Sequence, residues 1–173
     1  MIGAAQSDDY LPVSHSIDVV YESENFCGLR IGIEWPWLGA HPESNLFYRI
    51  VDLNGGGFVA PKTLIQPNKS DELLKLLNQK LARYVQEMEQ QENASENSEI
   101  VDILKGSSVE IRHLDWIQFS NRNWKGEHKP LEATLTCGFL YYAAQALEPY
   151  FTLTEQECRY FFNADFFSWQ DIK

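Results

Sequence analysis

The stretch CGLRIGIEW, residues 27–35, shows the most regular alternation of residue types in the chain. Successive side chains of a β-strand point to opposite faces, so an alternating segment predicts a strand with one buried face. We expect the apolar set to face the core and the glycines and charged residues to face away. The apolar set is Cys27, Leu29, Ile31, Ile33 and Trp35.

The segments on either side of this stretch predict further antiparallel strands. Residues 16–21 also alternate, and Glu24-Asn25 suits a turn, which together predict a hairpin with residues 27–35. NLFYRIVDL, residues 45–53, is apolar on both faces, as is typical of a central strand. NGGG, residues 54–57, is a strong hairpin-turn signal, and FVAP, residues 58–61, predicts a short return strand.

The stretch PNKSDELLKLLNQKLARYVQEMEQQ, residues 67–91, predicts one long amphipathic helix with Ser70 as its N-cap. Residues 89–99 are almost entirely polar and predict a mobile loop. Residues 100–106 predict a short helical turn. The apolar stripe of the long helix is Leu73, Leu77, Leu81, Tyr84 and Met88.

The second half of the chain predicts two more strands and a C-terminal helix. Residues 107–124 favour a strand with a bulge near Trp116, and residues 131–142 alternate well. Thr154 and Glu157 form a capping-box pattern ahead of aromatic residues at helical spacing. The order predicts a single α+β domain over residues 1–173, with residues 1–12 loose. Its antiparallel sheet has about five to six strands, covered by the long helix and the C-terminal aromatic helix.

The net charge of −11 comes from two acidic segments. Residues 1–26 hold five acids and residues 86–104 hold six, and neither segment contains Lys or Arg. The other residues hold 14 acids and 14 bases. This balance disfavours nucleic acid as a partner, because phosphate contacts need a basic surface. It favours a protein partner with a basic surface, drawn in by charge, although acidity that serves only solubility remains the alternative.

The sequence lacks the patterns typical of membrane spans, disulfide frameworks, metal sites and nucleotide sites. No stretch approaches the ~20 apolar residues that a membrane span needs, so no membrane partner is predicted. Three cysteines at unrelated spacings predict reduced thiols in a cytoplasmic protein rather than a disulfide framework. The four histidines are scattered, and the residues after NGGG are extended rather than helical. We therefore predict no metal site, no nucleotide site and no cofactor.

The residue types for one catalytic site are present. His113 and Asp115 would share a face of the strand predicted over residues 107–124, where the carboxylate could orient the imidazole. Cys137, on another predicted strand, would supply the nucleophile of a small hydrolase. The alternative is that Cys137 is an inert core thiol between Leu135 and Phe139.

The aromatic residues suggest contact surfaces. Trp35 continues the apolar side of its strand and is predicted to fill the core, whereas Pro36 turns the chain and directs Trp37 toward a loop. The helix that begins near Thr154 has more aromatic residues than one sheet can cover. They therefore predict a groove, a partner contact, or a homodimer formed through this helix, unless the helix is central in a large core.

The leading functional prediction is a small acidic protein that binds another protein. In its specific form it is a bacterial immunity-type inhibitor that neutralises a cognate toxin or effector by direct binding. One alternative is an adaptor or chaperone subunit of a secretion or phage system, and the other is the Cys/His hydrolase. The predicted partner-binding residues are Trp37, Glu87, Glu92, Glu96, Asp18, Glu22 and Trp124.

Overall fold

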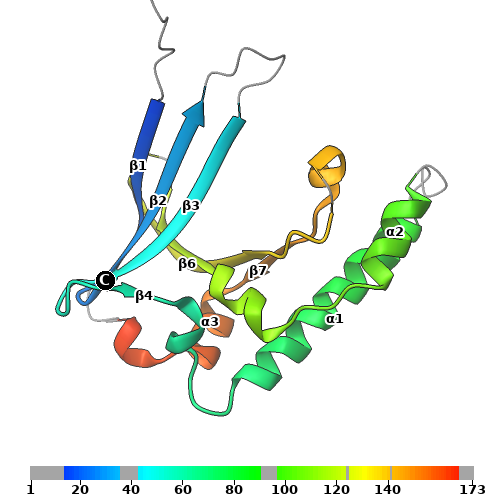
Figure 1. Ribbon diagram of the computed structural model, residues 1–173. Coiled ribbons are helices and arrows are strands. Elements are labelled where there is room, and N and C mark those ends of the chain that lie inside the picture. The colour runs from blue at the N-terminus through cyan, green and yellow to red at the C-terminus, as the bar shows by residue number, and fades with distance from the viewer. Residues whose placement is uncertain (1–13, 36–42, 91–96, 124, 141, 168–173) are drawn as a thin grey trace, which may run out of the picture.

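The computed structural model describes residues 14–35, 43–90, 97–123, 125–140 and 142–167. Four strands of the first half form an antiparallel sheet in the order β1-β2-β3-β4. They are β1 (Ser14–Glu22), β2 (Phe26–Trp35), β3 (Glu43–Asp52) and β4 (Phe58–Val59). The predicted turn joins β3 to β4, with the Asp52 N–H donating to the Gly57 carbonyl at 2.9 Å. Figure 1 shows β1, β2 and β3 rising side by side as a long blade.

A second antiparallel sheet contains β5 (Gln118–Arg122), β6 (His128–Thr136) and β7 (Tyr150–Leu153) in that order. The α+β class is therefore confirmed, but the strands divide between two sheets of four and three instead of one sheet of five to six. β7 was not predicted. Its four residues pair with β6, as in Leu135 opposite Phe151, and are too few to show a clear period of their own.

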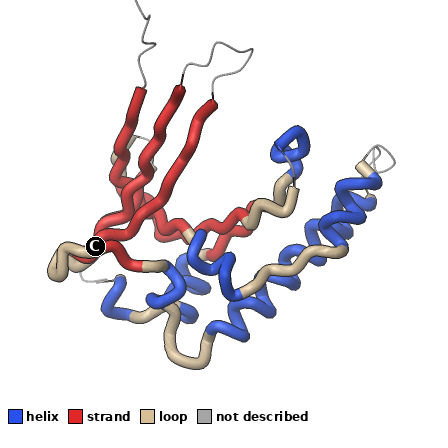
Figure 2. Tube along the Cα trace, viewed as in Figure 1, coloured by secondary structure: helices blue, strands red, loops and turns tan. Residues whose placement is uncertain are grey.

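The long helix α1 (Ser70–Glu89) confirms the apolar stripe, since Leu73, Leu77, Leu81 and Met88 are buried. The predicted N-cap was wrong by one residue, because Ser70 is already helical and Lys69 is the N-cap. The predicted helical turn near residue 100 is α2 (Ser98–Lys105), which packs on α1. Figure 2 shows these two helices as an arm on the side of the molecule opposite the blade. Of the residues predicted as loops, 1–12 and 91–96 lie outside the described part of the chain.

The segment predicted as one strand over residues 107–124 divides into two elements. Residues 111–116 form the 3-10 helix η2 (Ile111–Trp116), and the strand β5 starts only after Ile117. A local capping box explains the helix, because the Glu110 N–H donates to His113 Nδ1 at 2.9 Å while the Glu110 side chain accepts from the His113 backbone. The prediction of a strand here was wrong, because these local hydrogen bonds replace a ladder.

The C-terminal segment also differs from the prediction of one aromatic helix. α3 (Glu155–Phe161) is short and is followed by the 3-10 helix η4 (Ala164–Phe166). The other 3-10 helices are η1 (Pro61–Leu64) and η3 (Tyr142–Leu147). The phenylalanines of this segment are buried in the chain's own core, whereas Tyr160 of α3 is exposed, and a homodimer through this helix stays a prediction. The buried phenylalanines are Phe161, Phe162, Phe166 and Phe167.

The two sheets meet at the lower end of the blade through buried aromatic and polar contacts. The Tyr48 hydroxyl of β3 donates to the Phe119 carbonyl of β5 at 3.2 Å and accepts from the Phe119 N–H at 3.0 Å. The Tyr21 ring stacks on Phe166 with a centroid separation of 4.9 Å. The Asn121 side chain bonds the backbone N–H and carbonyl of Glu22. These contacts pack the lower part of the blade against the second sheet.

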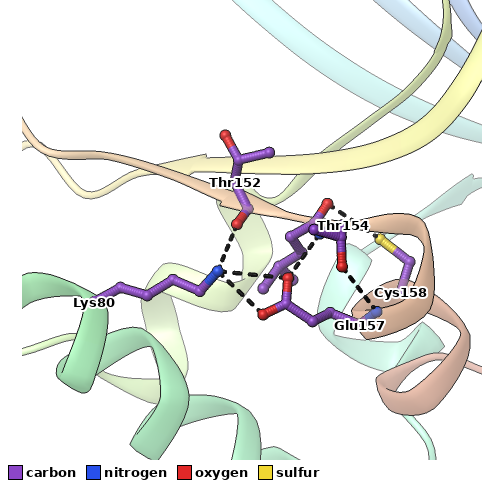
Figure 3. A network of polar contacts seen from close by, with 6 residues as sticks. Lys80, Thr152, Thr154, Glu157 and Cys158 are labelled. Carbon is purple, nitrogen blue, oxygen red and sulfur yellow. Dashed lines mark hydrogen bonds and ion pairs between the residues drawn. The ribbon is translucent and has the colours of Figure 1, made fainter.

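A polar network ties α1 to β7 and α3 (Figure 3). Lys80 Nζ donates to the Thr152 carbonyl at 2.8 Å and pairs with Glu157 Oε1 at 3.1 Å. The predicted capping box is confirmed, because the Glu157 carboxylate accepts from the Thr154 N–H at 2.7 Å and the Thr154 hydroxyl accepts from the Glu157 N–H. Burial by itself would raise the pKa of Glu157, but the Thr154 N–H and the Lys80 ammonium outweigh it and lower the pKa.

Candidate functional site

The structure does not assemble the residues considered for a hydrolase. His113 is buried, and its Nδ1 accepts the Glu110 N–H. The Asp115 carboxylate pairs instead with Lys62, whose Nζ lies 2.6 Å from Oδ2. Among the described residues no hydrogen bond joins His113 to Asp115 or to Cys137. A relay of base and orienting carboxylate is therefore not formed at these residues.

The ionisation of these groups also opposes nucleophilic chemistry. Burial raises the pKa of the Cys137 thiol to about 12, so the thiol stays protonated at neutral pH. Burial also lowers the pKa of His113, which makes the imidazole a weaker proton acceptor. Cys137 is therefore a core side chain, as the alternative interpretation of the sequence had it. Within the described ranges, no group of three or more His, Cys, Asp or Glu side chains could hold a metal ion.

The two predicted partner-binding acids of the N-terminal segment lie on β1, and each is paired with an arginine. Asp18 Oδ2 lies 3.3 Å from Arg30 Nη2, and the Glu22 carboxylate pairs with the Arg122 guanidinium. Pairs this exposed contribute little stability, but each arginine offsets the charge of its acid. β1 therefore does not present the strongly negative surface that its sequence suggests.

Glu87 is exposed on the last turns of α1, beside a shallow hollow of about 270 Å³ that Arg83 and Tyr150 also line. Figure 1 places this end of α1 and α2 on the side of the molecule opposite β1, so the described parts of the two acidic segments do not adjoin. The other predicted contact residues lie outside the described residues: Trp37, Glu92, Glu96 and Trp124. The Trp35 side chain is likewise not described, so its predicted burial stays untested.

The most distinctive surface is the blade face that carries the odd-numbered residues of β2. Ile17 of β1 and Phe47 of β3 lie opposite Ile31, and Val19 and Arg49 lie opposite Leu29. Opposed residues of an antiparallel sheet share a face, so these side chains form one surface. Ile17 is 68% exposed, Val19 44% and Phe47 39%. The prediction that this apolar set faces the core was wrong, and we call this surface the open face.

The opposite face of the blade is the packed one along its lower part. Gly28 is buried there, and a Cβ at that position would lie 2.6 Å from the Tyr48 hydroxyl and 2.8 Å from Tyr21 Cβ. Ile50, opposite Gly28, is only 1% exposed. Higher up the same face Leu46 is 64% exposed, so the packed region ends below it. A glycine inside a strand often marks a close approach, and Gly28 was the signal in the sequence for the buried face.

A hollow of about 660 Å³ adjoins the outer edge of β1. Ile17, Asp18 and Val19 line it on one side. Arg122 at the end of β5 and Lys125 in the turn between β5 and β6 line it on the other side. Cys27 also contributes to the wall, and burial, followed by the nearby Glu22 carboxylate, raises the pKa of its thiol. The hollow and the open face together make the N-terminal half of the molecule the candidate functional region.

The chain was compared with known proteins. No family model and no curated protein sequence matches it. Among solved structures, it is similar to a DUF3298 family protein from Pseudomonas aeruginosa PAO1, with a TM-score of 0.48 and 10% sequence identity. The match covers 86% of this chain and 61% of that protein, so the chain spans about three fifths of its length. No helix in the described part has both the length and the apolar character to cross a bilayer.

Proposed function

We propose that this protein works by binding another protein and that the open face of the blade is its main contact surface. The observation that carries the proposal is the exposure of Ile17, Val19 and Phe47 side by side on one face of a regular sheet. Contiguous exposed apolar side chains are a common mark of a protein-binding surface, whereas scattered ones need no explanation. A rigid sheet also loses little conformational entropy when it binds.

In its specific form, the proposal is an immunity-type inhibitor that covers the active site of a bacterial toxin or effector in the cytoplasm. The net charge of −11 favours a partner with a basic surface, because charge attraction speeds association. Glu87, exposed at the end of α1, contributes to this attraction. Trp37, Glu92, Glu96 and Trp124 stay predicted contact residues.

One observation favours an adaptor or chaperone as the second candidate. The upper part of the opposite face also has an exposed apolar side chain, that of Leu46. A sheet that is exposed on both faces near its end can hold a partner segment without covering an active site. The two functions differ in their effect, because an inhibitor abolishes the activity of its partner and an adaptor does not.

Site-specific photo-crosslinking in the cells that make the protein tests the proposal. A photoreactive amino acid replaces Ile17 on the open face, Glu87 at the end of α1, or the exposed Ile111 of η2 as a control position. We expect one discrete adduct from position 17, a weaker one from position 87 and none from position 111. The captured protein is then assayed with and without this chain to separate inhibitor from adaptor. An adduct only from position 111, or none at all, would overturn the proposal.

A further inference from the structure

No described strand pairs with the outer edge of β1. β1 is nine residues long and stands at the end of its sheet, and among the described residues it pairs only with β2. Proteins commonly protect such edges with proline, lysine, a bulge or a short strand. β1 contains neither proline nor lysine, and its one irregularity, between Val19 and Tyr21, lies near the lower end. From His15 to Val19 no ladder of the described strands uses its outer backbone groups.

The second sheet covers the lower end of this edge, and among the described strands none pairs with the upper part. Asn121 of β5 caps Glu22, accepting its N–H at 3.0 Å and donating to its carbonyl at 2.7 Å. Beyond this junction the hollow of about 660 Å³ lies beside Ile17, Asp18 and Val19. A neighbouring hollow of about 360 Å³ shares Arg30 and Arg122 with it. The larger hollow therefore runs along the edge from Ile17 down to Glu22, the residue whose backbone Asn121 caps.

Cations outnumber carboxylates among the side chains that line these two hollows, unlike in the whole protein. Their walls hold four cations and three carboxylates, a net charge of +1, in a chain of net charge −11. A guanidinium has five N–H donors. Arg30 uses one of them on Asp18, and Arg122 uses two, on Glu22 and the Gly126 carbonyl. The cations are Arg30, Arg122, Lys125 and Lys129, and the carboxylates are Asp18, Glu22 and Glu132.

From these observations we infer that the β1 edge binds an extended segment of the partner by β-strand addition, and that this segment carries an acidic side chain. The inference rests on the proposed function and defines how the partner engages the blade. The segment's N–H and C=O groups pair with the outer groups of residues 15–19. Alternate side chains then fall on the open face beside Ile17 and Val19 and are apolar. The acidic side chain points toward Arg122 at the end of β5 and Lys125 in the turn that follows.

A second copy of this chain is a weaker occupant of the same edge. Each copy would bring a net charge of −11, and the approach of two such molecules is opposed by repulsion. A partner with a basic surface is attracted by the overall negative charge of this protein. An acidic side chain on its extended segment is attracted by the cations beside the β1 edge.

Selection of peptides against the full-length protein tests the inference. Random peptides of about ten residues, the length of a strand with short flanks, are displayed on phage and selected on the immobilised chain. We expect enrichment of sequences that alternate β-branched or aromatic residues with polar ones and include Asp or Glu. An enriched peptide is then synthesised with N-methyl groups on alternate residues along either edge. Methylation of one edge is expected to weaken binding roughly tenfold or more, because it removes ladder hydrogen bonds, and methylation of the other is expected to be tolerated.

Two double variants test the charge. Arg30→Gln with Lys125→Gln should weaken peptide binding roughly tenfold, and Lys75→Gln with Arg112→Gln, which removes the same charge elsewhere, should not. Failure to enrich peptides, enrichment of basic peptides, indifference to N-methylation, equal effects of the two double variants, or a stable dimer through β1 would each overturn the inference. If peptides bind as expected but no partner crosslinks at position 17, the proposed function fails and the edge assignment stands. If a partner crosslinks there and peptides ignore N-methylation, only the edge assignment fails.

Discussion

The clearest test of the packing is a pair of identical substitutions on the two faces of the blade. Ile17→Ala alters the open face, where the side chain is 68% exposed, and Ile50→Ala alters the packed face, where it is 1% exposed. A buried Ile→Ala change costs about 2–5 kcal/mol through lost transfer energy and the cavity left behind. The exposed change should cost no more than about 1 kcal/mol, mainly through the lower strand propensity of alanine.

Urea unfolding measured by tryptophan fluorescence and circular dichroism separates the two outcomes. With a slope of about 2 kcal/mol per molar urea, Ile50→Ala should lower the unfolding midpoint by roughly 1–2.5 M and Ile17→Ala by less than about 0.5 M. A single transition is also expected, because one buried cluster includes residues of both sheets and of α1, as the single-domain proposal requires. Equal costs, or a larger cost at Ile17, would refute the assignment of the two faces.

Three further predictions concern the polar network around Glu157, the contact of Tyr48 with the second sheet, and the acidic residues from Glu87 onward. Glu157→Gln should cost about 0.5–2 kcal/mol at pH 7. Because the folded-state pKa of Glu157 is lowered, its contribution is present above the ordinary carboxyl range and is lost as pH falls through the folded pKa, so the melting temperatures of variant and wild type should converge as the pH falls below that pKa. Tyr48→Phe should cost about 1–3 kcal/mol in urea unfolding, because it leaves the buried Phe119 N–H and carbonyl without their partner. Reversing Glu87, Glu92 and Glu96 to Lys should slow partner association at low salt without changing the fold, at about 0.2–1 kcal/mol per charge; an unchanged stopped-flow rate would reduce these acids to solubilising charge.

Features with local causes could be predicted from the sequence. The turn at residues 54–57 depends on its glycines, and the capping box depends on two residues three positions apart. The α1 stripe depends only on helical period. In each case the residues that determine the structure are neighbours in the chain, so no knowledge of distant elements was needed.

The face of the blade that is buried could not be predicted from alternation alone. Alternation shows that residues 27–35 have an apolar side, but a second sheet must cover that side for it to be buried. The second sheet instead packs against the side of Gly28, where the Tyr48 hydroxyl and Tyr21 leave no room for a Cβ. The aromatic C-terminal segment depends on the second sheet in the same way. The sequence left open whether residues such as Phe162 and Phe166 form a contact surface or part of a large core, and the second sheet packs Phe119 against both.

For the same reason, only part of the candidate site could be predicted from the sequence. Asp18 and Glu22 are recognisable as acids in the sequence, but their pairing with Arg30 and Arg122 depends on strand register and on the approach of β5. The hollow beside β1 likewise forms between segments about 100 positions apart. No pattern within β1 itself indicates that no described strand pairs with its outer edge.

The central claim is most directly tested by the affinity of the crosslinked partner for two variants at adjacent residues of β3. Phe47→Ser removes an apolar ring from the open face, and Leu46→Ser removes an apolar side chain that is at least as exposed from the opposite face. Titration calorimetry should show that Phe47→Ser weakens binding roughly tenfold or more, while Leu46→Ser changes the affinity by less than about threefold. Urea unfolding confirms that both variants are folded. A loss confined to Leu46→Ser, or no loss from Phe47→Ser, would contradict the assignment of the open face as the partner-binding surface.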